Sequence, residues 1–125
     1  MIKIERNRKS KGFTLAYCAP EQIKGSKYGF ECDIWSLGIL IYHVLTLQEP
    51  YAEFFVGKDK KACVPLFLNE IKTNNMRPSI PEKYYSKEPE LVSLIISCLE
   101  YKSYNRPKLE NIIETLKNII TNHMC

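Results

Sequence analysis

Residues 34–47 read IWSLGILIYHVLTL, a nearly continuous apolar run. The run is interrupted only by Ser36, Gly38, His43 and Thr46. It is too short to span a bilayer, which takes about 20 residues, and a helix without a polar face must be surrounded by protein. We therefore expect a central buried helix over about residues 33–47. Asp33 stands at its start, where a carboxylate suits the helix dipole and can cap free amides, and Pro50 is expected to end it.

The segments that follow predict helices around this central one. Residues 52–64 contain glycine and a charged cluster, so we expect an exposed loop there, followed by a short helix over residues 65–74. Its buried side should carry Leu66, Phe67 and Ile71. Residues 91–101 have apolar side chains at helical spacing, with Pro89 suited to the first turn. Residues 109–120 form the clearest amphipathic helix. Because no segment alternates like a strand, we expect an all-α domain of four or five helices.

Size and charge set limits on the class of protein. At 125 residues, with 45% hydrophobic and 26% charged residues, the chain fits one globular domain. The basic residues near the start fit either a nucleic-acid-binding arm or a solvated terminus, and the second is favoured because no aromatic residues interleave with the charges. The basic residues are Lys3, Arg6, Arg8, Lys9 and Lys11. We expect no signal peptide, because the first residues are charged and no apolar stretch follows them. We expect neither nucleic acid nor a membrane as a partner.

Cysteine usage favours a reducing compartment. None of the five cysteines lies in a CxxC pair, and only two histidines could join them as ligands, so we expect no metal site. The cysteines are Cys18, Cys32, Cys63, Cys98 and Cys125. Their apolar neighbours indicate reduced, mostly buried thiols. The expected location is therefore cytoplasmic or nuclear.

Three separated segments carry a recognisable pattern. TLAYCAPE at residues 14–21 matches T-x-x-Y-x-A-P-E, DIWSLG at residues 33–38 matches D-x-W-S-x-G, and NRP at residues 105–107 places an arginine before the last helix. A single tripeptide recurs by chance, but three motifs in order with helices between them are specific. The chain therefore resembles the helical C-terminal lobe of eukaryotic protein kinases over residues 12–120. RPSIP at residues 77–81 also resembles a turn found in many kinases, notably the tyrosine-kinase-like group.

The resemblance implies a buried ion pair between Glu21 and Arg106, which would tie the end of the activation segment to the helices. A planar guanidinium suits a carboxylate in bidentate fashion. Without the motifs, both residues would be taken for solvent-exposed charges. The resemblance also implies that Trp35 packs beside the pair and that Gly38 allows close approach of a neighbouring backbone. In kinases the aspartate at the position of Asp33 accepts hydrogen bonds from the catalytic loop, so capping is its remaining role here.

A substrate-binding wall made by Thr14, Tyr17 and Cys18 is implied in the same way. Thr14 matches a threonine that lies close to the catalytic carboxylate in serine/threonine kinases. Tyrosine kinases usually have tryptophan at the position of Tyr17, which favours the serine/threonine type. Ser10 lies where activation segments often carry a phosphate, so it is either a phosphorylation site or an unmodified surface serine.

Other kinase features are missing from the sequence. It contains no G-x-G-x-x-G, HRD or DFG motif, which in kinases cover the phosphates, supply the base and hold the metal ions. Kinases also usually have glycine where Phe13 and Leu47 stand. We therefore expect no catalytic residue, metal ligand or cofactor in this chain, whereas the intact domain of the family uses ATP and Mg²⁺.

The expected fold is an all-α, truncated C-terminal lobe of the protein kinase-like fold. Residues 1–11 would form a basic N-terminal tail and residues 12–122 a partial kinase domain. One interpretation is a piece of an enzyme that transfers the ATP γ-phosphoryl group to Ser or Thr of proteins, inactive alone. The alternative is a non-catalytic module that binds partner proteins. A third interpretation, an unrelated helical domain, would gain support if Glu21 and Arg106 lay far apart. Truncation also predicts an exposed apolar patch on the order of several hundred Å².

Overall fold

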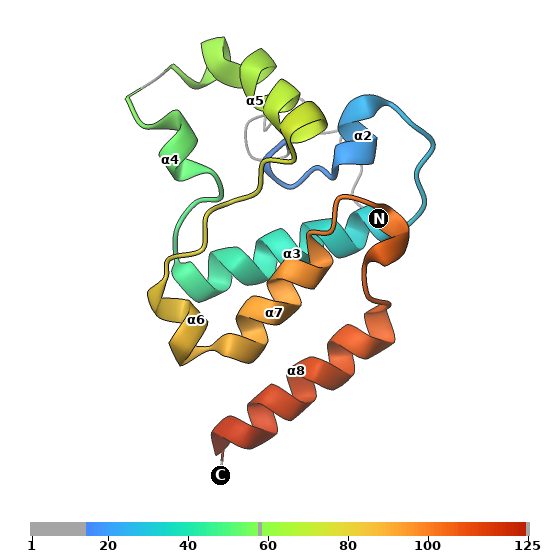
Figure 1. The fold of residues 1–125 in the computed structure, drawn as a ribbon, viewed down its shortest axis with the longest axis vertical. Helices are drawn as coiled ribbons and strands as arrows, with labels where there is room; N and C mark the ends of the chain where they lie inside the picture. Colours follow the sequence, from blue (N-terminus) through green and yellow to red (C-terminus); the bar gives the residue numbers. More distant parts are fainter. Residues whose placement is uncertain (1–14, 58, 125) are drawn as a thin grey trace.

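The computed structural model describes residues 15–57 and 59–124, and this part of the chain folds into helices without any β-strand (Figure 1). The helices are α2 (Pro20–Lys24), α3 (Glu31–Thr46), α4 (Ala52–Phe55), α5 (Lys60–Asn74), α6 (Lys83–Lys87), α7 (Pro89–Cys98), the 3₁₀ helix η3 (Ser103–Asn105) and α8 (Leu109–Met124). The all-α prediction is confirmed. The predicted number of helices was too low, because α2, α4, α6 and η3 are each only about one turn long and leave no periodic pattern.

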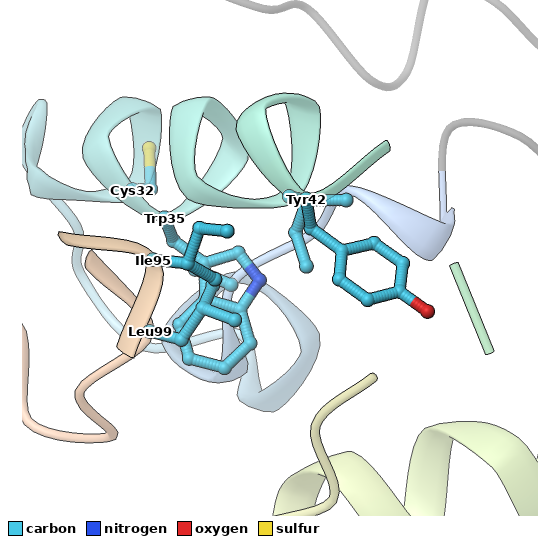
Figure 2. Packing of buried hydrophobic residues seen from close by; sticks show 7 residues of the cluster. Cys32, Trp35, Tyr42, Ile95 and Leu99 are labelled. Carbon is cyan, nitrogen blue, oxygen red and sulfur yellow. The ribbon is translucent and has the colours of Figure 1, made fainter. Parts of the chain in front are cut away.

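Helix α3 forms the centre of the molecule. Figure 1 shows α7 lying across it, with α8 at one end of the molecule and α4 and α5 at the other. Trp35, Ile39 and Tyr42 of α3 are at most 1% exposed and pack with Ile95 and Leu99 (Figure 2). Each fully buried side chain of this size contributes about 1.5–3 kcal/mol. The apolar run at residues 34–47 is therefore the main core element, as predicted.

Gly38 sets the distance between α3 and α7. A Cβ atom at this position would lie 2.6 Å from the Cβ of Cys98 and 3.2 Å from Cδ2 of Leu99. No side chain fits there, so the glycine lets the two helices approach closely. This is the close approach that the motif implied for Gly38.

The last helix covers only part of the core. Ile112 and Ile119 of α8 are buried, and Ile112 packs with Ile34, Leu94 and Cys98. The other half of the apolar stripe remains accessible, since Leu109, Ile113 and Ile120 are 46%, 45% and 57% exposed. The predicted amphipathic helix is present, but its apolar face is wider than the surface it contacts.

One face of α3 is also uncovered. Leu40 and Val44, one turn apart, are 46% and 65% exposed, and Leu47 just beyond the helix is 84% exposed. These three residues form the exposed α3 stripe. The truncation argument predicted an exposed apolar patch, and the area of that patch stays a prediction.

The end of α3 differs from the prediction. The helix ends at Thr46, and Leu47 adopts a left-handed conformation with φ 57° while its N–H bonds the carbonyl of His43 at 2.8 Å. The helix therefore ends before Pro50, the residue that was expected to end it. A left-handed residue usually occupies this position after a helix, and glycine is the residue that fits it without strain.

Helix α5 begins earlier than the sequence indicated. It starts at Lys60 and runs through Pro65, within the segment expected to be a loop. Phe67 and Ile71 are buried against Tyr51, as predicted for the second half of the helix. Leu66, however, is 50% exposed, so its predicted place on the buried side was wrong. Between α5 and α6, residues 77–81 are without regular structure, in agreement with their two prolines.

Among residues 15–57 and 59–124, no helix combines the length and the apolar character that crossing a bilayer requires.

Candidate functional site

Hydrogen bonds fix the backbone at both ends of α2. Pro20 occupies its first turn, and the side-chain oxygen of Gln22 accepts the N–H of Ala19 at 2.9 Å. After the helix, Gly25 turns left-handed at φ 76° and its N–H bonds the carbonyl of Gln22. This short helix is too small to be stable alone. Its position must therefore come from tertiary contacts, and Glu21 makes the strongest of them.

Arg106 binds Glu21 through two parallel hydrogen bonds, from Nη1 to Oε2 at 2.7 Å and from Nη2 to Oε1 at 2.9 Å. Its remaining N–H groups donate to three backbone carbonyls. These carbonyls belong to Glu31 at 2.9 Å, Glu100 at 2.8 Å and Tyr101 at 3.2 Å. All five donors of the guanidinium thus have acceptors, which is the condition under which a buried charge is tolerated.

The surroundings of this ion pair are largely dry. The side chain of Arg106 is 0% exposed and that of Glu21 is 14% exposed. The guanidinium carbon lies 5.1 Å from the centre of the Trp35 ring, where a cation is attracted to the π face. The sequence analysis named all three residues, and the structure brings them together. The interpretation as an unrelated helical domain would have gained support from a large separation of Glu21 and Arg106, and their direct contact gives it none.

Ser36 provides a second connection that the sequence analysis did not assign. Its hydroxyl oxygen lies 2.7 Å from the carbonyl of Tyr17 and 3.2 Å from the carbonyl of Cys32, so it joins the segment before α2 to α3. Ser36 is 7% exposed. A signal was available in the sequence, because a hydroxyl on an otherwise apolar buried helix needs an acceptor.

Asp33 does not cap α3. The helix begins at Glu31 without a side-chain cap, which places Asp33 in the first turn. There its charge still suits the helix dipole. The hydrogen bond found for its carboxylate comes from the thiol of Cys32, at 3.8 Å. The predicted capping role was therefore wrong, because the helix starts two residues earlier than the motif suggested.

Two buried thiols lie close to this site. Burial is the main cause that raises the pKa of Cys18 to about 12, and the neighbouring Cys32 adds to it. Burial and the negative charges of Asp33 and Glu21 raise the pKa of Cys32 to about 11. Both cysteines are therefore protonated at neutral pH and unsuited to nucleophilic chemistry. The four described cysteines form no disulfide.

Only part of the predicted substrate-binding wall lies among the described residues. Thr14 and Ser10 lie outside the described residues, as do the tail over residues 1–11 and Phe13. Tyr17 is partly exposed, and burial raises the pKa of its hydroxyl. Cys18 is 4% exposed. The substrate-facing roles of Thr14, Tyr17 and Cys18 stay predictions.

Candidate metal ligands do not cluster in the part of the chain that the structure describes. Within residues 15–57 and 59–124, no group of three His, Cys, Asp or Glu side chains is arranged so that it could hold a metal ion.

A comparison with known protein families supports the assignment that the three motifs and the ion pair indicate. The model of the protein kinase domain matches residues 2–116, which is most of the chain. The chain belongs to the protein kinase family. Its all-helical structure and its three motifs identify the part of the kinase domain as the C-terminal lobe.

Curated relatives support the same assignment. The chain is 38% identical to the serine/threonine-protein kinase ppk16 of Schizosaccharomyces pombe over 80% of its own length and 13% of that protein. It is 33% identical to mitogen-activated protein kinase kinase 2 of Arabidopsis thaliana over 81% of its own length and 27% of that protein. It is 31% identical to the dual specificity protein kinase shkD of Dictyostelium discoideum over 92% of its own length and 14% of that protein. The chain thus spans about a quarter or less of these relatives.

Proposed function

We propose that this chain forms the substrate-facing helical lobe of a serine/threonine protein kinase and does not transfer phosphate alone. In an intact kinase domain, which uses ATP and Mg²⁺, this lobe would present Thr14, Tyr17 and Cys18 to a protein substrate. Its partners would then be protein substrates or regulators.

The observation that carries the proposal is the ion pair between Glu21 and Arg106. It holds the segment at residues 17–21 against α3 and the loop after α7, and Ser36 fixes the same segment from the other side. A substrate wall needs this rigidity, because catalysis by positioning loses rate when a contact surface shifts by about 1 Å. The extensive fixing of so short a segment is what a substrate-facing role requires.

The inactivity of the chain alone follows from its sequence. Phosphoryl transfer depends on a phosphate-covering loop, a base and metal-binding side chains, and the motifs that supply them do not occur among the 125 residues. Losing members of a catalytic set lowers the rate by several orders of magnitude.

A phosphorylation assay tests this part of the proposal. The purified chain, incubated with Mg²⁺, ATP labelled on its γ-phosphate and a general protein acceptor, should give no incorporation above a sample without protein. Incorporation that scales with chain concentration, and that persists after removal of contaminating kinases, would refute it. The coding frame upstream of Met1 tests the other part. In-frame HRD and DFG motifs there support a kinase lobe, whereas a stop codon without them contradicts it.

A second candidate function rests on the exposed α3 stripe of Leu40, Val44 and Leu47. A non-catalytic module would use such a surface to bind a partner protein. The variant Leu40→Gln with Val44→Gln should then lower self-association and apolar dye fluorescence without lowering the free energy of unfolding. A parent chain that is monomeric and binds no dye would remove the support for this second function.

A further inference from the structure

Two lysine–tyrosine pairs, joined by the adjacent residues Tyr101 and Lys102, lie on the surface beside the ion pair. The Nζ atom of Lys24, at the end of α2, lies 4.8 Å from the centre of the Tyr101 ring. Tyr101 is followed in the chain by Lys102, whose Nζ lies 6.0 Å from the centre of the Tyr104 ring. We call these four residues the lysine–tyrosine ladder. It brings together α2 and the segment between α7 and α8, which are far apart in sequence.

The ladder is held in place by the fold beneath it. The hydroxyl of Tyr101 donates to the carbonyl of Lys72 in the last turn of α5, at 2.6 Å. The carbonyl of Tyr101 accepts from the buried Arg106 at 3.2 Å. Lys24, Lys102 and Tyr104 are themselves exposed, and Tyr104 is 74% exposed. The fixed ring of Tyr101 below the ammonium group of Lys24 reduces the side-chain freedom that binding would otherwise remove.

Two acidic residues near the ladder, Glu21 and Glu100, form no ion pair with its lysines. Both carboxylate oxygens of Glu21 are bound by Arg106. Glu100, the residue before Tyr101, lines a separate groove of about 380 Å³ together with Arg77 and Ile96. The ammonium groups of Lys24 and Lys102 are therefore left facing solvent, supported by rings and without a carboxylate partner among the described contacts.

We propose that the lysine–tyrosine ladder binds an acidic peptide segment of another protein, with carboxylates meeting Lys24 and Lys102. Charge complementarity favours an anion, and the rings favour a peptide over a nucleic acid. Single-stranded nucleic acids bind where successive bases stack on open aromatic faces, whereas Tyr101 is half-buried and carries Lys24 on its ring. The site does not depend on catalysis, so it can be tested apart from the proposed kinase function.

Fluorescence anisotropy on the full chain tests the proposal. The probe is a labelled peptide in which glutamate alternates with glycine, compared with a matched peptide in which glutamine replaces every glutamate. The chain should bind the glutamate peptide more tightly, and the affinity should fall as salt is raised. The variant Lys24→Gln with Lys102→Gln should weaken binding about three- to tenfold, the range expected for two exposed charge contacts.

A control variant with the same change in net charge makes the result specific. Lys87→Gln with Lys117→Gln alters two exposed lysines on α6 and α8 and should change the affinity by less than about twofold. Every variant retains the amino-terminal basic residues, so the difference isolates the ladder. The role of the ring is tested by Tyr104→Phe, which should bind like the parent, and Tyr104→Leu, which should bind more weakly.

Three outcomes would overturn the proposal. The parent chain could fail to bind the glutamate peptide, the two double variants could weaken binding equally, or a labelled single-stranded oligonucleotide could bind more tightly than the peptide and be lost with Lys24→Gln. The last result would assign the ladder to nucleic acid instead.

Discussion

Arg106 links several parts of the lobe through a single side chain. It is a charged group without solvent contact, and it joins acceptors from α2, α3 and the loop after α7. A lysine has a single nitrogen and cannot supply the planar, two-pronged geometry that Glu21 requires. The contribution of this residue therefore comes from its shape as much as from its charge.

We expect Arg106→Lys to lower the free energy of unfolding by about 3 kcal/mol or more, because a buried ion pair with one ill-fitting partner leaves charge and carbonyl groups unsatisfied. Urea denaturation followed by circular dichroism measures the change. Arg77→Lys is the matched control, since Arg77 is exposed and its Nε donates to one carbonyl, that of Leu99. A loss no larger than that of the control would contradict the buried role of Arg106.

Leu47 offers the opposite test, a substitution that should stabilise. Its φ of 57° is strained for any residue with a Cβ, and its side chain is 84% exposed, so little burial is lost on removing it. We expect Leu47→Gly to raise the free energy of unfolding by about 0.5–1 kcal/mol, the strain relieved less the added freedom of the unfolded chain.

Tyr51 is the matched contrast for Leu47. It has a similar φ of 63°, but its ring is 1% exposed and packs against Phe67. Tyr51→Gly should therefore destabilise the chain, because the loss of a buried aromatic ring costs about 3–5 kcal/mol. Thermal or urea unfolding of both variants gives the comparison. If Leu47→Gly also destabilised, backbone strain would be unimportant at this position.

At the scale of helices, the close contact of α3 with α7 depends on Gly38, which has no side chain. We expect Gly38→Ala to lower the free energy of unfolding by about 1–3 kcal/mol, because the new methyl group would overlap the Cβ of Cys98, which belongs to the helix framework and cannot rotate away. Urea denaturation measures this loss.

Gly29→Ala provides the control for that substitution. Its added Cβ would lie 2.8 Å from Oε1 of Glu31, a similarly close approach, but the atom it meets is the end of a flexible side chain. Glu31 can move, so we expect a change within about 0.5 kcal/mol. Equal effects of the two substitutions would show that rigid helix packing is not what makes Gly38 necessary.

The sequence was sufficient for the helices with strong periodicity and insufficient for the rest. Residues 34–47 and 109–120 are long enough for burial to dominate, so α3 and α8 could be predicted. Helix α6 is a single turn without buried residues, and Pro65 inside α5 contradicts local preference. Phe67 and Ile71 anchor that helix after the proline, and such tertiary contacts cannot be read from local spacing.

The candidate site was predictable where its residues belong to motifs. Glu21, Trp35 and Arg106 were placed correctly, because three segments in register indicate which distant residues meet. Ser36 lies in the same motif, but its role depends on which carbonyl approaches α3, and the sequence does not specify that. The capping role of Asp33 failed for a related reason, since the first residue of a helix is set by the chain that precedes it.

For the whole molecule, buried thiols give stability a dependence on pH. Burial raises the pKa of Cys98 to about 11, and burial together with neighbouring groups raises those of Cys18 to about 12 and Cys32 to about 11, from an ordinary value of 9.0. The unfolded chain releases these protons at a lower pH than the folded chain does. The free energy of unfolding should therefore be unaffected by these groups below pH 9 and fall as the pH rises above it.

We expect a loss of about 1 kcal/mol or more between about pH 8 and about pH 10, measured by urea denaturation. Cys18→Ala should make this fall shallower, since it removes one of the buried protons. Cys63→Ala controls for the loss of a thiol from a partly buried position. A stability that is flat over this range would mean that the three thiols are more hydrated than the structure indicates.

Glu21 and Arg106 are 85 positions apart in the chain. A ribosome adds about 5–20 residues per second, so the carboxylate is synthesised about 4–17 s before the guanidinium that neutralises it. Until then α2 lacks its ion-pair partner, and the carbonyl groups of residues 31, 100 and 101 lack their shared donor. A nascent chain whose translation stops before codon 106 therefore cannot form this ion pair. Its segment around α2 is then more accessible to the proteases that degrade unfinished chains.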